Sequence, residues 1–132
     1  MKNLFICGML ICLFSACLEK IDTSKLKNTN WELSSLPEME LPTNAKATLN
    51  FGDSLNVTGK SFCNNYGGKV ELIDNKVAFK NIFGTKMLCM QNDAAERAYL
   101  SALNQVNGAK LENDQLHLLT DGKTVLVFKR AN

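Results

Sequence analysis

Short runs in which apolar and polar residues alternate constrain the fold of this chain more than any other feature. Ala47, Leu49 and Phe51 show the pattern most clearly, since polar residues separate them and a period of two is typical of a half-buried strand. Eight strands are predicted in this way, at residues 30–36, 47–51, 55–58, 69–73, 76–82, 109–112, 115–119 and 124–128. Turns every 8–12 residues or so predict a small, mainly β (α+β) domain whose strands form an antiparallel barrel or a strongly curved sheet.

Turn-forming residues connect these runs. Gly52-Asp53-Ser54 predicts a hairpin between the second and third runs, and Asp74-Asn75 predicts a two-residue turn between the fourth and fifth. Asn113-Asp114 and Asp121-Gly122 do the same for the last three runs. The predicted strands are therefore mostly neighbours in both sequence and space.

One segment changes period and predicts a helix packed against the sheet. Between residues 91 and 106, Ala95, Tyr99, Leu103 and Val106 recur at spacings of three and four. We expect Tyr99 to be a core aromatic residue. Asp93 stands three residues before Glu96, which predicts a capping box, and Gly108 is expected to end the helix as a C′ glycine.

The first sixteen residues predict a lipoprotein signal peptide. Lys2 gives a positive start, and residues 4–16 are almost purely apolar but shorter than the roughly 20 residues of a spanning helix. The sequence Phe-Ser-Ala-Cys at 14–17 resembles a bacterial lipobox, in which the cysteine is acylated and becomes the mature N-terminus. We expect Cys17 to carry fatty acyl chains such as palmitate. The alternative is an ordinary signal peptide cut after Ala16.

The rest of the chain divides into a lipidated tether at residues 17–27 and a folded domain at residues 28–131. Cleavage removes Cys7, Cys12 and one of the 15 basic residues, which leaves 14 basic side chains against 13 acidic ones. A net charge of about +1 with both signs scattered gives no indication of nucleic-acid binding. We expect a monomer that is anchored to the membrane through Cys17.

Two glycine-containing segments each present one cysteine. Residues 58–68 contain Cys63, and residues 84–89 contain Cys89. In an oxidising compartment the two cysteines can form a disulfide, which would stabilise the fold by about 3.5 kcal/mol for a loop of this length. The alternative is a pair of reduced, buried cysteines that pack as small hydrophobic residues.

Metal and thiol chemistry have few partners in the predicted mature chain. A zinc site uses about four ligands, whereas the mature chain offers Cys63, Cys89 and a single histidine, His117. His117 alternates with Leu116 and Leu118, so its side chain should point outward. A nucleophilic cysteine needs a base within hydrogen-bonding reach, and no pattern brings His117 to Cys63. We expect no metal, no cofactor and no catalytic residue.

The residues that follow Cys63 are a candidate binding loop. Asn64, Asn65 and the nearby glycines tolerate left-handed backbone conformations and favour a tight turn between two strands. Loop tips on rigid scaffolds often carry function. Asn64, Asn65 and Tyr66 are therefore the predicted contact residues for an unknown protein or small molecule.

Four segments together resemble a known family. They are Asn-Thr-Asn-Trp-Glu-Leu at 28–33, Phe-Cys-Asn-Asn-Tyr-Gly-Gly at 62–68, Thr-Lys-Met-Leu-Cys at 85–89 and the closing run at 121–128. With Gly59, Glu96 and Tyr99 they resemble the META domain, the family of the HslJ-like heat-shock proteins. The resemblance implies a small antiparallel β domain with a helix, often secreted or anchored in the cell envelope. Family members are linked with stress response, drug tolerance and motility, and the family offers no catalytic residues to transfer.

These observations lead to one expected function and two alternatives. We expect a non-enzymatic bacterial envelope lipoprotein, in the outer membrane and facing the periplasm or the cell surface. It would contribute to stress or drug tolerance through binding or structural support. The first alternative is a β-barrel carrier or inhibitor that captures a small molecule or a protein through the Cys63 loop. The second is a thiol-dependent enzyme or redox protein, which requires a reduced, accessible cysteine beside His117 or a lysine.

Overall fold

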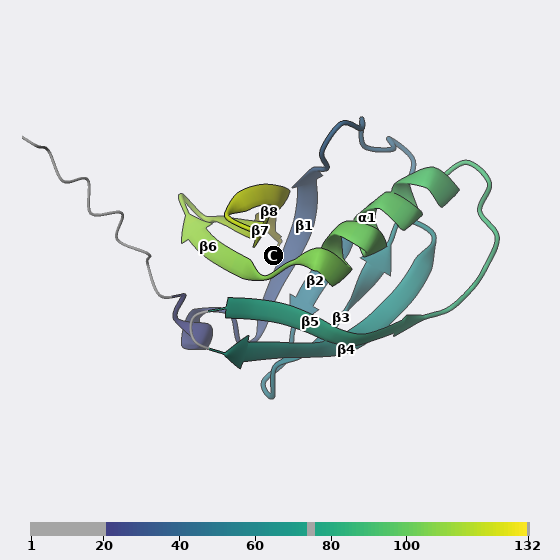
Figure 1. Ribbon diagram of the computed structural model, residues 1–132. Helices are drawn as coiled ribbons and strands as arrows, with labels where there is room; N and C mark the ends of the chain where they lie inside the picture. The colour runs from purple at the N-terminus through teal and green to yellow at the C-terminus, as the bar shows by residue number, and fades with distance from the viewer. Residues whose placement is uncertain (1–20, 74–75, 132) are drawn as a thin grey trace, which may run out of the picture.

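The computed structural model describes residues 21–73 and 76–131. In this part of the chain, eight strands and one α-helix follow a short 3-10 helix, η1 (Figure 1). Their bounds are η1 Thr23–Lys25, β1 Thr29–Ser35, β2 Thr48–Phe51, β3 Asn56–Ser61, β4 Asn64–Ile73, β5 Lys76–Gly84, α1 Asp93–Gln105, β6 Gly108–Glu112, β7 Gln115–Thr120 and β8 Lys123–Ala131. The predicted lipidation site at Cys17 and the predicted turn at 74–75 lie outside the described residues.

All eight strands belong to one antiparallel sheet in the order β5-β4-β3-β2-β1-β8-β7-β6. The sheet curves until its two edge strands, β5 and β6, approach each other, but no hydrogen-bond ladder joins them. Helix α1 lies across the curved sheet and contacts β3, β5 and β8 (Figure 1). The prediction of a mainly β domain with a strongly curved sheet and one helix is confirmed, and the barrel is not closed.

The predicted alternation places the apolar residues inside the curved sheet. Ala47, Leu49 and Phe51 are all buried, as are Leu116 and Leu118 on β7. Two hairpins close with turns in which both central residues have positive φ: Asn113-Asp114 and Asp121-Gly122. These residue types adopt that conformation readily, and its twist matches that of the flanking strands.

The two predicted helix caps are wrong. Asn92 is the residue before α1, and its side chain makes no capping hydrogen bond, while Glu96 bonds elsewhere. At the other end, Val106 is extended and caps through its own N–H to the Leu103 carbonyl. Gly108 begins β6. The helix therefore ends by entering an extended strand and needs no left-handed glycine.

The core is built from residues between Leu26 and Phe128. Trp31, Tyr99 and Phe128 are its largest fully buried side chains. The edges of the Phe62, Tyr66 and Phe128 rings surround Tyr99, with ring centroids 5.8 to 6.3 Å away. Tyr99 on α1 is thereby packed against the connection between β3 and β4, against β4 and against β8.

The predicted domain boundary at residue 28 lies too far along the chain. Leu26 is fully buried in the core, and η1 precedes it. The Leu26 carbonyl accepts a hydrogen bond from Thr29, whose hydroxyl accepts another from the indole N–H of Trp31 at 2.8 Å. Residues that the sequence assigns to the tether are therefore part of the fold, because one buried leucine attaches them to it.

Candidate functional site

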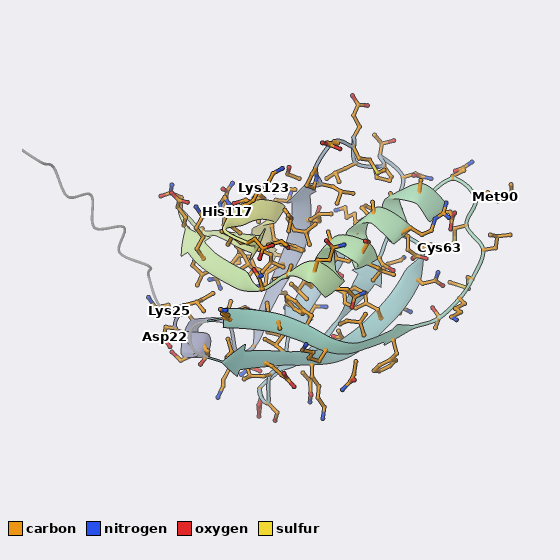
Figure 2. The ribbon with its side chains drawn as sticks, viewed as in Figure 1. Asp22, Lys25, Cys63, Met90, His117 and Lys123 are labelled. Atoms are coloured by element: carbon orange, nitrogen blue, oxygen red, sulfur yellow. A yellow bond between two sulfur atoms is a disulfide. The ribbon has the colours of Figure 1, made fainter. Side chains whose placement is uncertain are left out.

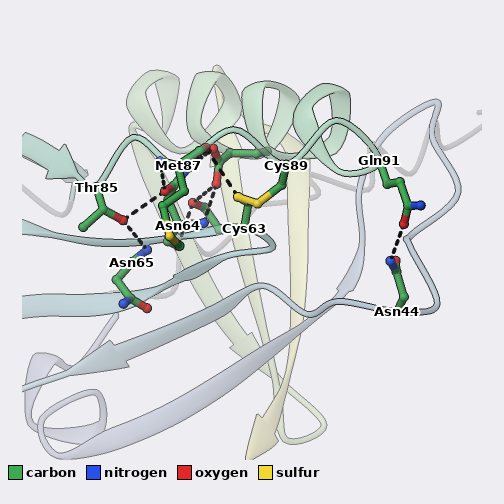
Figure 3. The surroundings of a disulfide bond; sticks show 10 residues. Asn44, Cys63, Asn64, Asn65, Thr85, Met87, Cys89 and Gln91 are labelled. Atoms are coloured by element: carbon green, nitrogen blue, oxygen red, sulfur yellow. Dashed lines mark hydrogen bonds between the residues drawn. A yellow bond between two sulfur atoms is a disulfide. The ribbon is translucent and has the colours of Figure 1, made fainter.

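The two cysteine segments meet, as the sequence predicts. Cys63 lies in the two-residue connection between β3 and β4, and Cys89 lies in the loop that leads to α1 (Figure 3). The two residues are joined by a disulfide with their Cα atoms 5.9 Å apart. The bridge is therefore present, and neither sulfur is a free thiol.

The predicted loop around Cys63 is much shorter than expected. Strand β3 continues to Ser61 and β4 begins at Asn64, so only Phe62 and Cys63 connect them. Phe62 supplies the tight reversal with a φ of 71°. The glycines belong to strands instead: a Cβ at Gly59 would collide with the Thr48 carbonyl oxygen and lie 2.8 Å from the Tyr66 hydroxyl.

Asn64 organises the site through its side-chain amide. Its Nδ2 donates to Glu96 Oε1 at 2.7 Å and to the Met87 carbonyl oxygen at 3.1 Å. Its Oδ1 accepts from the Met87 N–H at 2.7 Å and from the Thr85 hydroxyl at 3.0 Å. One buried side chain thus connects the start of β4, the loop before the helix and the helix itself (Figure 3).

Glu96 completes this cluster from α1. Its Oε2 accepts hydrogen bonds from the Ser61 hydroxyl at 2.7 Å and from the Asn64 backbone N–H at 2.8 Å. Partial burial raises the pKa of Glu96, but the bonds from Ser61, Asn64 and the Cys63 backbone outweigh it and hold the pKa below its usual value. The carboxylate is a structural acceptor, which explains why it does not form the predicted capping box.

A second buried polar group lies deeper in the core. The Tyr66 hydroxyl donates to the Thr48 carbonyl oxygen at 2.7 Å and lies 2.6 Å from the Tyr99 hydroxyl. Burial raises the pKa of both tyrosines above the usual range. The prediction that Tyr99 is a core residue is confirmed, and both hydroxyls stay protonated at physiological pH.

The predicted binding loop at Asn64, Asn65 and Tyr66 is wrong in two respects. The three residues belong to strand β4, and Asn64 and Tyr66 are buried. Their polar atoms are occupied by Glu96, Met87 and Thr48. Asn65 alone has an exposed side chain, so the predicted location in an exposed loop is wrong, and a binding role for these residues stays a prediction.

His117 and the cysteines are not neighbours. His117 is on β7 between two buried leucines, so its side chain faces away from the core as predicted. In Figure 2 it appears at the opposite end of the molecule from Cys63. Within residues 21–73 and 76–131, no group of three potential metal ligands gathers.

The sequence pattern did not reveal the apolar side chains that the molecule exposes beside the disulfide. Leu88 and Met90 are 82% and 84% exposed, and Met87 and Phe83 are 59% and 72% exposed. The available signal is the apolar run Met87-Leu88-Cys89-Met90, which has neither strand nor helix periodicity and precedes the helix. We call residues 85–91 the apolar loop.

One surface depression lies apart from this region. It has a volume of about 370 Å³, is open to solvent, and is lined by Lys25, Leu111, Glu112, Asn113, Asp114 and Arg130. Two cationic and two anionic side chains share it, so its charges balance.

No helix in the described part of the chain is long and apolar enough to span a membrane.

Comparison with known proteins identifies the family. The META domain matches residues 24–132. This chain belongs to the META domain family. Among curated proteins, no relative matches it. The buried Asn64 and Tyr66 and the partly buried Glu96, together with the disulfide, therefore belong to a META domain.

Three solved structures are similar to this chain. A protein from Burkholderia xenovorans, solved by NMR, is 30% identical with a TM-score of 0.65, covering 83% of this chain and 86% of that one. A second NMR structure is 21% identical with a TM-score of 0.66 and covers 83% and 94%. A crystal structure of a DUF4847 family protein from Bacteroides vulgatus is 12% identical with a TM-score of 0.60 and covers 83% and 96%. The last two resemblances show a shared fold.

Proposed function

We propose that this META domain protein is a non-enzymatic lipoprotein of the bacterial cell envelope. Acylated Cys17 anchors it in the outer membrane, facing the periplasm or the cell surface. The folded domain contributes to stress or drug tolerance through binding or structural support. The membrane is its constant partner, and it needs no cofactor.

The observation that carries the non-enzymatic part of the proposal is the self-sufficiency of the polar cluster. Each side-chain polar atom of Asn64 has a partner within the protein, and Glu96 accepts three hydrogen bonds. A catalytic acid or base needs a free position facing a substrate. This carboxylate instead stabilises the junction of two strands and a helix.

The anchoring part of the proposal is supported by the way the chain enters the fold. Leu26 is buried and Asp22 caps η1, so the fold begins at about residue 22. Cys17 stands only four residues before Ile21. Those four residues span about 15 Å when extended. A lipidated Cys17 would therefore keep the domain close to the bilayer surface.

The alternative of a carrier for a small molecule has less support. A ligand inside the curved sheet would compete with Trp31, Tyr99 and Phe128, which fill the interior. The residues proposed to capture it at the Cys63 segment are buried or bonded to their neighbours. The alternative of a thiol enzyme needs a free cysteine, whereas the sulfurs of Cys63 and Cys89 are bonded to each other.

Mass spectrometry of the mature protein from its native membrane, under non-reducing conditions, tests the anchor directly. We expect an N-terminal Cys17 with the added mass of acyl chains, and a domain mass two hydrogens lower than that of the reduced form. A Cys17→Ser variant should lose the acyl mass. Cys12→Ser is the matched control inside the signal and should keep it. An unmodified Cys17 in the wild type would refute the lipoprotein proposal.

A deletion strain tests the physiological role. We expect it to grow more slowly than the parent under envelope stress from detergents or antibiotics, and a plasmid copy should restore growth. The Cys17→Ser copy should restore it less than the Cys12→Ser copy, since anchoring concentrates the domain at the membrane. Equal growth of the parent and the deletion strain under all these conditions would contradict a role in stress or drug tolerance.

A further inference from the structure

The apolar loop is held in place from inside while its side chains point to water. The backbone N–H and carbonyl of Met87 both bond to the Asn64 side chain, and Cys89 is fixed to Cys63. Leu88 and Met90 flank the bridged cysteine and are more than four-fifths exposed. Exposure of apolar side chains to water is unfavourable. A loop that is already fixed in this conformation loses little further conformational entropy when these side chains become buried against a partner.

A basic surface adjoins the apolar loop on the outer face of β3, β4 and β5. Lys69 on β4 lies directly opposite Lys80 on β5, an arrangement of like charges that destabilises an isolated sheet. Gly67 and Phe83 form the neighbouring pair, and the Phe83 ring lies over the glycine on this face. Lys60 pairs with Asn65 one row further on. An exposed aromatic ring is thus flanked by lysines on both sides.

These lysines form no ion pair within the described residues, and Glu71 is the one carboxylate that shares their face of β4 and β5. Residues 54–92 contain five lysines and two acidic residues, although the charges of the whole chain nearly balance. The ion pairs within the described residues involve Lys46, Arg97, Lys110 and Lys129. Among these residues, no carboxylate lies within 4 Å of the ammonium groups of Lys60, Lys69, Lys80 or Lys86. The surface is therefore complementary to an anionic one.

The start of the described chain and the apolar loop lie at opposite ends of the molecule. Asp22 and Lys25 lie at one end and Met90 at the other (Figure 2). Strands β4 and β5 run lengthwise between these ends (Figure 1). A bilayer contact at the apolar loop would therefore be separate from the one that an acylated Cys17 makes.

We propose that Lys60, Lys69, Lys80, Phe83, Lys86, Met87, Leu88 and Met90 form a membrane-contact face that binds an anionic lipid bilayer. The lysines meet the lipid headgroups, and the apolar side chains enter the boundary between headgroups and acyl chains. This inference rests on the proposed envelope location for the source of the bilayer. It adds a protein-mediated membrane contact to the one made by the acyl chains of Cys17.

Vesicle sedimentation tests the face without the lipid anchor. The probe is an equimolar mixture of phosphatidylcholine and phosphatidylglycerol, with pure phosphatidylcholine vesicles as reference, and the protein is residues 17–132 with Cys17→Ser and the disulfide intact. We expect this region to sediment with the mixed vesicles and to remain in solution with the reference vesicles. Raised salt should release it, because screening weakens the attraction.

Variants identify the residues responsible. Lys69→Gln with Lys80→Gln should weaken partitioning about 25-fold, from roughly fivefold per lysine near an anionic surface. Leu88→Ser with Met90→Ser should weaken it about a hundredfold, because two apolar side chains no longer enter the bilayer. The matched controls are Lys46→Gln with Lys123→Gln, and Met39→Ser. They should bind like the wild type, and circular dichroism checks that all variants fold.

Two outcomes would overturn the proposal. In one, the wild type fails to bind the mixed vesicles, which would leave a protein partner as the occupant of this face. In the other, the control variants lose as much binding as the test variants. Since the tested protein carries no acylated cysteine at position 17, failure here leaves the lipid anchor intact, and an unmodified Cys17 in the native protein leaves the vesicle result intact.

Discussion

Two adjoining regions of this molecule reverse the usual distribution of polarity. Behind the disulfide, Asn64 and Glu96 form a polar cluster in which the amide is buried. In front of it, Leu88 and Met90 are among the most exposed side chains described. The polar cluster satisfies its own hydrogen bonds, whereas Leu88 and Met90 leave most of their surface in water. The first region therefore stabilises the fold, and the second is available for binding.

This difference predicts that substitutions in the two regions change different properties. Substitutions in the polar cluster should destabilise the domain. Substitutions of the exposed side chains in the apolar loop should change binding with little effect on stability. Four predictions test this separation, and the expected loss of stability decreases from the first to the last.

Asn64→Asp should be the most damaging. The new carboxylate faces Glu96 and cannot donate to it or to the Met87 carbonyl, which leaves an uncompensated buried charge at a cost of about 4 kcal/mol. Chemical denaturation measures the loss, and acidification should reduce it by protonating the new group. Asn65→Asp is the exposed neighbour and should cost under about 0.5 kcal/mol. Similar losses for the two variants would contradict the role of Asn64.

Replacement of both cysteines by alanine comes next. Without the bridge, the unfolded chain gains entropy and the domain should lose about 3.5 kcal/mol. The apolar loop should also become a protease site at Lys86, which limited trypsin digestion would reveal. A loss below about 1 kcal/mol would show that the bonds to Asn64 hold the loop without help from the disulfide.

Glu96→Gln should cost about 2 kcal/mol at neutral pH, because three hydrogen bonds to a charged acceptor become weaker or face a donor. The pKa of Glu96 is lowered from 4.5 in the folded state, so the unfolded chain binds more protons near that pH. The carboxylate's contribution is therefore complete above pH 4.5 and declines as the pH falls further. Denaturation curves of both proteins should converge in acid, and a constant gap would contradict this linkage.

Leu88→Ser with Met90→Ser should leave the free energy of unfolding within about 0.5 kcal/mol of the wild type. Both side chains already face water in the folded state, so their loss removes little buried area. Thermal denaturation provides the measurement. A clear destabilisation would mean that these side chains support the fold and would remove the contrast between the two regions.

Sequence patterns revealed most of the fold. Period-two runs and turn residues such as Asn113-Asp114 act locally, so eight strands and the final hairpins were predictable. The disulfide was predictable as one of two alternatives, since Cys63 and Cys89 are the only two cysteines after residue 17. The extent of β3 and β4 was not predictable, because glycine suggests turns. Gly59 instead allows the close approach of Thr48 from a neighbouring strand.

The polar cluster was harder to predict because its partners are far apart in sequence. Asn64 and Glu96 are 32 residues apart, and the local signal at Asp93 favoured a capping box. One clue was present: Glu96 stands three residues before Tyr99 and thus on the helix face that packs against the sheet. A carboxylate on an otherwise apolar helix face indicates a buried acceptor.

The strand order has a consequence for how the chain folds. Strands β1 to β5 pair in succession, and so do β6 to β8, but β1 and β8 join the two halves. Pairing Asn30 with Ala131 closes a loop of about 100 residues, the most entropically demanding step among the ladders described. High contact order of this kind slows folding. During synthesis, strands β1 to β5 can therefore pair first, and β1 stays without its second neighbour until β8 is available.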